Sequence, residues 1–280
     1  YAMQESGRFP VTGYESDGSP IVDPASGYEA DGFTENWIHP IESSYKDAEG
    51  NKIPLPIKVH NSCKGRDARF YASILFNGAY WLTPNNGPKL VTFYKGGTSS
   101  YGQSSGDFCK VGFLFRRMTN PTNDYVAKEW GEFSWPFFRL GEIFLSYAEA
   151  CNEMEPRDET NALLYINKIR NRSGLNNLEE AYPEVKGNKE LFRQLLQKER
   201  LVEMAFENLR YWDLRTWMIN STEANGPRYG LDLTATKYED SWKRTTKITL
   251  PIVFEMKHSL FPIYQGQLDE MRNITQNTGW

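Results

Sequence analysis

Residues 199–217 read ERLVEMAFENLRYWDLRTW, and this stretch decides the fold. Apolar residues lead into it and run through it at spacings of four, seven, four and three, which places them on one face of a helix. These residues are Leu191, Leu195, Val202, Phe206 and Leu209. The pattern predicts one continuous amphipathic helix through residues 199–217.

The same helix carries a ridge of acidic side chains. Glu199, Glu203 and Glu207 lie four residues apart and would repel one another on an isolated helix. Cationic partners are close in the sequence: Arg170, Arg172, Arg200, Arg210 and Arg215. We therefore predict ion pairs that lock helices together, with Glu199, Glu203 and Arg210 mostly buried and paired with other charged side chains. Such pairing holds carboxylates ionised, which suits a structural role better than proton donation.

Several motifs resemble the SusD/RagB family of outer-membrane nutrient-binding lipoproteins. Residues 199–217 look like the family's signature helix, residues 138–150 (FRLGEIFLSYAEA) and 166–175 (INKIRNRSGL) like the two helices ahead of it, and residues 261–263 (FPI) with 276–280 (QNTGW) like its C-terminus. Residues 65–70 (GRDARF) are a weaker match, with alanine where the family has proline. The charged signature positions are Arg139, Glu142, Glu149, Arg170, Arg172, Glu199, Arg200, Glu203, Glu207, Arg210, Asp213 and Arg215.

The resemblance implies a function without catalysis, cofactor or metal. Family members capture an oligosaccharide or polysaccharide at the cell surface and deliver it to a TonB-dependent outer-membrane transporter of the SusC type. They begin with a lipoprotein signal, a lipid-bearing cysteine and a long helical N-terminal half. We therefore expect this chain to be the C-terminal portion of such a protein, with the membrane anchor in the missing part. Two alternatives remain open, a peptide-binding lipoprotein of the same family and a glycoside hydrolase, which needs only two carboxylates.

Composition and scattered motifs exclude other classes. The net charge of −4 and the pI of about 5.6 argue against a nucleic-acid partner. His39, His60 and His258 are far apart and no paired-cysteine spacing exists, which argues against a metal site. The three cysteines do not define a disulfide framework. A disulfide between Cys63 and Cys109 stays open, and Cys151 is expected to be a small buried apolar residue.

The chain is expected to be mainly α with a minor β part, and to divide into three regions. Residues 1–135 are loop- and strand-rich on the ligand side, residues 136–217 are helical and residues 218–280 are loop-rich. Glycine, proline, serine and aspartate recur throughout residues 1–62, which predicts loops there. Strands are predicted within residues 70–76, 90–94, 111–115 and 247–250, and a short helix within 254–260.

Three helices are expected in the helical region. The first covers residues 140–154, the second starts near Asp158–Thr160 and ends at Gly174, and the third opens at Asn188. The first two resemble a tetratricopeptide-type hairpin. The first helix has two apolar stripes, so we expect it to expose apolar surface that the missing repeats would cover. The stripes are Ile143, Tyr147, Ala150 and Met154, and Leu140, Phe144, Ala148 and Cys151.

A glycan site needs flat aromatic rings and amide or carboxylate partners for hydroxyl groups, often on loops. Trp37 beside Asn36 is the best-placed candidate, and we expect its ring to be partly exposed on a concave face near one of three tyrosines. Those tyrosines are Tyr14, Tyr28 and Tyr45, and the second choices are Trp81 and Tyr101. Each of these rings can instead serve packing.

Overall fold

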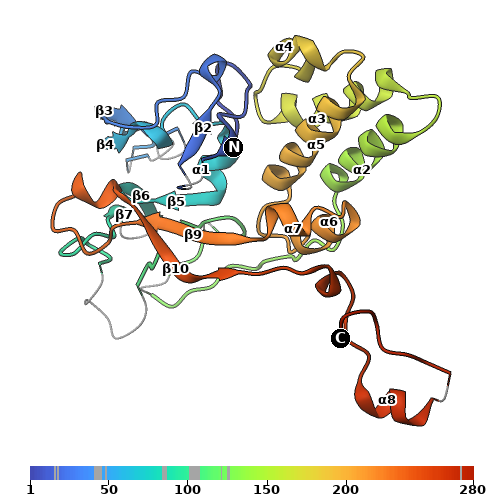
Figure 1. Cartoon of the computed structure of the whole chain (residues 1–280). Helices are drawn as coiled ribbons and strands as arrows, with labels where there is room; N and C mark the ends of the chain where they lie inside the picture. Colours follow the sequence, from blue (N-terminus) through green and yellow to red (C-terminus); the bar gives the residue numbers. More distant parts are fainter. Residues whose placement is uncertain are drawn as a thin grey trace.

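The structure is a computed structural model of residues 1–280 and describes most of them. The described residues are 1–15, 17, 19–40, 46–47, 49–83, 87–100, 108–120, 122–124, 127–271 and 273–280, without the side chains of residues 82–83 and 247–252. Helices gather on one side and short strands on the other, and a C-terminal arm extends away from both (Figure 1). The mainly helical fold with small antiparallel sheets agrees with the sequence prediction.

The helical side forms as its local sequence signals predict. Asp158 caps the second helix by accepting a hydrogen bond from the Asn161 amide at 3.0 Å. Gly174 follows that helix with a φ of +74°, the left-handed conformation that favours glycine. Asn188 caps the next long helix through the Leu191 amide at 3.0 Å. The helices of this side are α2 (Leu140–Glu153), α3 (Glu159–Arg172), α4 (Leu178–Ala181) and α5 (Lys189–Glu203).

The single helix predicted through residues 199–217 is wrong. Helix α5 ends at Glu203, and α6 (Arg210–Thr216) starts a new helix, followed by α7 (Asn220–Glu223). Phe206 and Asn208 take φ values of +66° and +62° between them, so the backbone turns left-handed and cannot continue the α-helix. The turn reverses the chain so that the carboxylate of Glu207 meets two arginines, Arg117 and Arg139.

The β side consists of antiparallel pairs, each of two strands. Residues 1–62, predicted to be loops, contain four of these strands, because short hairpins also need glycine and proline at their turns. The pairs are β1 (Val11–Tyr14) with β2 (Pro20–Val22), β3 (Phe33–Ile38) with β4 (Pro56–His60), β5 (Ile74–Phe76) with β8 (Phe113–Phe115), β6 (Ala79–Thr83) with β7 (Gly87–Val91), and β9 (Gly226–Leu231) with β10 (Arg244–Ile252).

The strand predicted over residues 70–76 is only half correct. Its first part is the helix α1 (Ala68–Ser73), and only β5 is extended. Asp67 precedes α1 and accepts a hydrogen bond from the Arg69 amide at 2.8 Å. This local cap favours a helical turn over the alternating pattern. The predicted short helix within residues 254–260 is present as the 3-10 helix η6 (Met256–Ser259), and α8 (Gln265–Glu270) lies farther along the arm.

Two separate apolar cores lie behind these elements. The helical core packs α2, α3, α4 and α5 around Leu145, Ile166 and Phe192. The β-side core packs Phe76, Phe93 and other residues from β4, α1, β5 and β6 together with the segment after β9. The three cysteines are buried as free thiols, so Cys63 and Cys109 do not form a disulfide, and Cys151 packs in the helical core as expected.

An ion-pair network joins the two sides of the molecule. Glu199 on α5 is fully buried between Arg69 of α1, at 2.6 Å from its Oε1, and Arg170 of α3, at 3.1 Å from its Oε2. Glu203, one turn on, accepts Arg139 and Arg172, both at 2.5 Å, and Arg69 at 3.1 Å. We call these residues, with Asp67, Glu207 and Arg117, the ion-pair network.

The predicted burial of Glu199 and Glu203 is therefore confirmed. Burial opposes ionisation of Glu203, but the hydrogen bond and charge of Arg139, with the charges of Arg172 and Arg69, hold the pKa of this carboxyl below its usual range. Arg210 is mostly buried and paired, as predicted, but less completely buried than the two acids. Its side chain is 32% exposed and reaches Glu223 at 3.4 Å, because α6 begins after the backbone break rather than on the buried face of α5.

The remaining signature residues stabilise the neighbouring turns. The Arg200 guanidinium donates to Asp213 at 2.9 Å and lies 4.0 Å from Glu142. Glu149 accepts the Trp217 indole N–H at 2.7 Å. Arg215 donates to the His258 carbonyl at 2.9 Å and so ties α6 to the C-terminal arm.

Helix α2 exposes an apolar stripe, as expected. Leu140, Ile143, Tyr147 and Met154 are all exposed and recur with Ala150 at spacings of three and four. Such spacing forms a straight seam on one face of a helix. On the opposite face Leu145 and Ala148 are fully buried in the helical core. No helix in the described part of the chain is long and apolar enough to span a membrane.

Replacing one buried acid of the network tests its structural weight. We expect Glu199→Gln to lower the free energy of unfolding by about 3–5 kcal/mol, because Arg69 and Arg170 would keep their buried charges without a full counter-charge. Urea unfolding followed by circular dichroism measures the change. Glu190→Gln is the matched control, because Glu190 lies on the same helix in an exposed pair with Arg193 and should cost about 0.5 kcal/mol or less. Equal effects of the two changes would contradict the structural role.

His39 gives the β-side core a pH dependence of its own. Its ring is fully buried and stacks on Phe76 with 5.6 Å between centroids. Burial lowers its pKa to about 3, with a smaller contribution from the charge of Arg116. The unfolded chain binds a proton near pH 6.5 and the folded chain does not, so stability falls as pH drops through that range.

We therefore expect His39→Phe to flatten the pH dependence of stability. From pH 7 to pH 5 the wild type should lose about 2 kcal/mol through this residue, a range in which most carboxylates stay ionised. Urea unfolding at both pH values measures the difference. His60→Phe is the comparison, because burial also lowers the pKa of His60 while its interaction with Asp31 opposes the shift. Parallel pH curves for wild type and His39→Phe would refute the assignment to His39.

Candidate ligand-binding site

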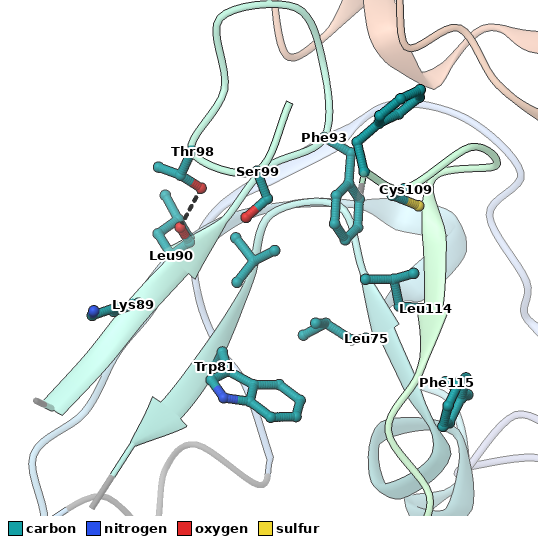
Figure 2. A pocket seen from close by; sticks show the side chains of 12 residues that line it. Leu75, Trp81, Lys89, Leu90, Phe93, Thr98, Ser99, Cys109, Leu114 and Phe115 are labelled. Atoms are coloured by element: carbon teal, nitrogen blue, oxygen red, sulfur yellow. Dashed lines mark hydrogen bonds between the residues drawn. The ribbon is translucent and has the colours of Figure 1, made fainter. Parts of the chain in front are cut away.

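A cavity of about 720 Å³ lies between the β6–β7 hairpin and the β5–β8 pair (Figure 2). This volume is within the range of pockets that bind small ligands. Apolar and aromatic side chains predominate in its lining. The described lining residues are Leu75, Trp81, Lys89, Leu90, Val91, Phe93, Thr98, Ser99, Phe108, Cys109, Leu114 and Phe115.

The β6–β7 hairpin positions one wall of this cavity. Trp81 of β6 lies directly opposite Lys89 of β7 in the ladder. Residues directly opposite in an antiparallel pair share a face of the sheet, so the indole and the lysine side chain start from the same face. In Figure 2 the indole lies between the two sheets, and Lys89 stands at the outer margin across the hairpin.

The β5–β8 pair forms the facing wall. Leu75 of β5 pairs with Leu114 of β8, and Phe115 follows on β8 with its side chain 65% exposed. The chain before β8 is held by Cys109, whose sulfur accepts the Gly112 amide at 3.1 Å. Gly112 has a φ of +89° and lies against Leu231, so a side chain there would clash. This tight turn leads directly into β8, which forms the facing wall of the cavity.

Polar groups are few around the cavity. The Thr98 hydroxyl donates to the Leu90 carbonyl at 2.7 Å, a contact that Figure 2 marks. The Ser99 amide donates to the Thr92 carbonyl at 2.9 Å, so the segment after β7 folds back onto that strand. The site therefore combines aromatic surface with the Ser99 hydroxyl, the Thr98 hydroxyl, whose proton is already donated to Leu90, and one ammonium group.

Cations also lie against the aromatic rings of the lining. The Arg116 guanidinium is 6.0 Å from the centroid of Trp81, and the Lys110 ammonium is 6.0 Å from that of Phe108. The Arg116 side chain is half-buried, and this burial lowers its pKa from the ordinary value. None of the described lining residues is acidic.

The site residues predicted from sequence do not come together in the structure. Only Trp81 lines the cavity. Trp37 belongs to strand β3 rather than to a loop. The centroid of its half-buried ring lies 5.7 Å from the ring centroid of Tyr71 and 5.6 Å from that of His39. The apolar partners of Trp37 are distant in sequence, which is why the local sequence around it appears polar.

The other predicted aromatic residues are scattered. Tyr14 ends β1 and is 67% exposed. Tyr28 lies under the Arg66 guanidinium, 4.5 Å from its ring centroid. Asn36 is exposed in β3 with a φ of +53°. Tyr45 and Tyr101 lie outside the described residues, and the role of all these residues in ligand binding stays a prediction.

Sequence reasoning missed most of the cavity wall. Phe115, Leu114 and Lys89 gave no signal of their own, because only the strand register brings them beside Trp81. The sequence predicted strands within residues 90–94 and 111–115 but not which strands pair with them. Among the described residues, no group of three or more histidine, cysteine, aspartate or glutamate side chains is placed to hold a metal ion.

Comparison with known proteins gives a family and a fold. The model of the SusD family matches residues 12–280. A SusD-like protein from Bacteroides fragilis has a solved structure with 23% sequence identity and a TM-score of 0.65, matching 99% of this chain and 46% of its own. The solved structure of BT4246 in its selenomethionine form has 22% identity and a TM-score of 0.69, over 98% of this chain and 50% of its own. The chain thus spans about half the length of these proteins. No curated protein matches it.

The packing of Trp37 has a measurable consequence. We expect Trp37→Ala to lower the free energy of unfolding by about 2 kcal/mol, because the half-buried ring would leave a gap beside Tyr71. Thermal and urea unfolding measure the loss. Tyr14→Ala is the control, because its ring is mostly exposed and its removal should change stability by about 0.5 kcal/mol or less. An unchanged stability of Trp37→Ala would mean that the ring is not part of the β-side core.

Proposed function

We propose, because this chain belongs to the SusD family, that it binds an oligosaccharide or polysaccharide without transforming it. The site we propose is the cavity between the β6–β7 hairpin and the β5–β8 pair. The single observation that carries this assignment is Trp81, a flat aromatic ring in a cavity that two hydroxyl-bearing residues also line. Aromatic faces stack on the C–H-rich faces of sugars, and hydroxyl groups pair with sugar hydroxyls.

The lining supports binding over hydrolysis. A glycosidase needs a pair of carboxyl groups on either side of the scissile bond. The described lining contains none, and the densest acidic set of the chain, Glu199, Glu203 and Glu207, is engaged by arginines of the ion-pair network. Those acids hold helices together and are not presented to a ligand.

The wider role proposed for the protein follows from the family alone. We propose that it acts at the bacterial cell surface, is held at the outer membrane by a lipid anchor, and hands its glycan to a TonB-dependent transporter of the SusC type. Asn36 and Trp37, with Tyr14 and Tyr28, remain a second proposed contact region. The partial exposure of Trp37 supports this, although its ring also packs against the β-side core.

Removal of the Trp81 ring tests the proposed site. We expect Trp81→Ala to weaken glycan binding roughly fivefold, because stacking of one aromatic ring contributes about 1 kcal/mol. A glycan array identifies a ligand of the wild type, and isothermal titration then compares the two proteins. Trp135→Ala is the control, because Trp135 is an exposed aromatic residue that does not line the cavity.

Three outcomes would contradict the proposal. If Trp81→Ala and the wild type bound the glycan with equal affinity, the cavity would not be the binding site. Release of reducing sugar from a bound glycan would make the protein a hydrolase. Binding to a peptide library with no binding on the array would favour the peptide-binding alternative.

A further inference from the structure

The charged side chains that line the cavity or contact its rings are cationic among the described residues. Lys89 lines it, and Arg116 and Lys110 lie against the rings of Trp81 and Phe108. No described lining residue is acidic. The whole chain, in contrast, carries a net charge of −4. Grouped charges of one sign beside low-dielectric walls concentrate oppositely charged ligands.

Lys89 is an exposed cation in the lining of the cavity. Within the described part of the chain, no carboxylate lies within 4 Å of its ammonium group, and its side chain is exposed. Lys58, on the same side of the molecule, shows the contrasting case, since it pairs with Glu35 at 2.9 Å and Glu239 at 2.8 Å. A lysine that forms no ion pair within the protein has its ammonium group available to pair with a bound anion.

The register sets Lys89 beside the aromatic surface. Because it stands directly opposite Trp81, its side chain starts from the neighbouring strand on the same face of the sheet. A sugar ring stacked on Trp81 would have its substituents or its neighbouring unit on the Lys89 side. A carboxylate or a sulfate there would form a charge-assisted hydrogen bond.

We infer that this cavity selects an acidic saccharide, one that carries a carboxylate or a sulfate group, with the sugar ring on Trp81 and the anion at Lys89. This inference rests on the proposed function, since it specifies which glycans the same cavity takes. Uronic acids and sulfated sugars share the required chemistry, and the experiment below separates the two sources.

The test compares acidic probes with neutral forms of the same backbone. Isothermal titration of the full chain would use a galacturonic acid hexamer and its fully methyl-esterified form, and a sulfated galactan hexamer and its desulfated form. We expect at least one acidic probe to bind more tightly than its neutral form. Lys89→Gln should reduce that preference roughly three- to tenfold, because the acidic form loses more affinity than the neutral form does. The preference should also shrink as salt rises.

Lys186→Gln is the matched control. Lys186 is exposed after the 3-10 helix η4 (Pro183–Val185) on the helical side, so its loss removes the same charge from the chain without touching the cavity. It should leave the preference intact. Thermal unfolding confirms that both variants are folded.

Each contrary result has a distinct meaning. Neutral probes that bind as tightly as acidic ones, or a preference that Lys89→Gln leaves unchanged, would overturn the acidic-saccharide inference while the proposed glycan binding stands. If Lys186→Gln lost as much of the preference for acidic probes as Lys89→Gln, the preference would come from the net charge of the chain. This result would overturn the inference as well. Failure of the wild type to bind any glycan on the array, acidic or neutral, would overturn the proposed function and this inference together.

Discussion

The contact of Glu199 with Arg69 and Arg170 is the constraint on which the rest of the structure depends. All three side chains are buried or nearly so, and a buried charge without its partner is strongly destabilising. Arg69 comes from α1 and Arg170 from α3, so one carboxylate fixes the position of a β-side helix against two helices of the other side. Hydrophobic burial alone would allow these surfaces to slide, because it is not directional. The fixed geometry of the guanidinium groups does not allow this.

The position of the cavity follows from this constraint. Helix α1 runs directly into β5, and β5 continues through a tight turn at residues 77–78 into β6. The same short segment therefore carries Arg69 at one end and Trp81 at the other. The facing wall, β8, pairs with β5 and is also fixed by it. The positions of the cavity walls therefore depend, through a few residues of chain, on the ion pairs that hold α1 against the helical side.

Local signals predicted the helical side well and the β side poorly. Asp158, Gly174 and Asn188 act within a few residues of themselves, so their sequence context is enough to place the helix ends. The break after Glu203 was not foreseeable, because Arg117 and Arg139, which pair with Glu207 in the turn of Phe206 and Asn208, are distant in sequence. The site divides in the same way. Trp81 is recognisable as an aromatic residue in a turn-rich region, whereas Lys89, Leu114 and Phe115 join it only through strand register.

The seam of exposed apolar residues on α2 has a consequence for the colloidal behaviour of the chain. Leu140, Ile143, Tyr147 and Met154 offer a straight strip to any similar strip on a second molecule. At neutral pH, mutual repulsion between negatively charged molecules opposes such encounters. Close to the isoelectric point, near pH 5.6, that repulsion disappears, while the attraction between apolar strips is unchanged. We therefore expect the solubility of this chain to fall as the pH approaches its isoelectric point.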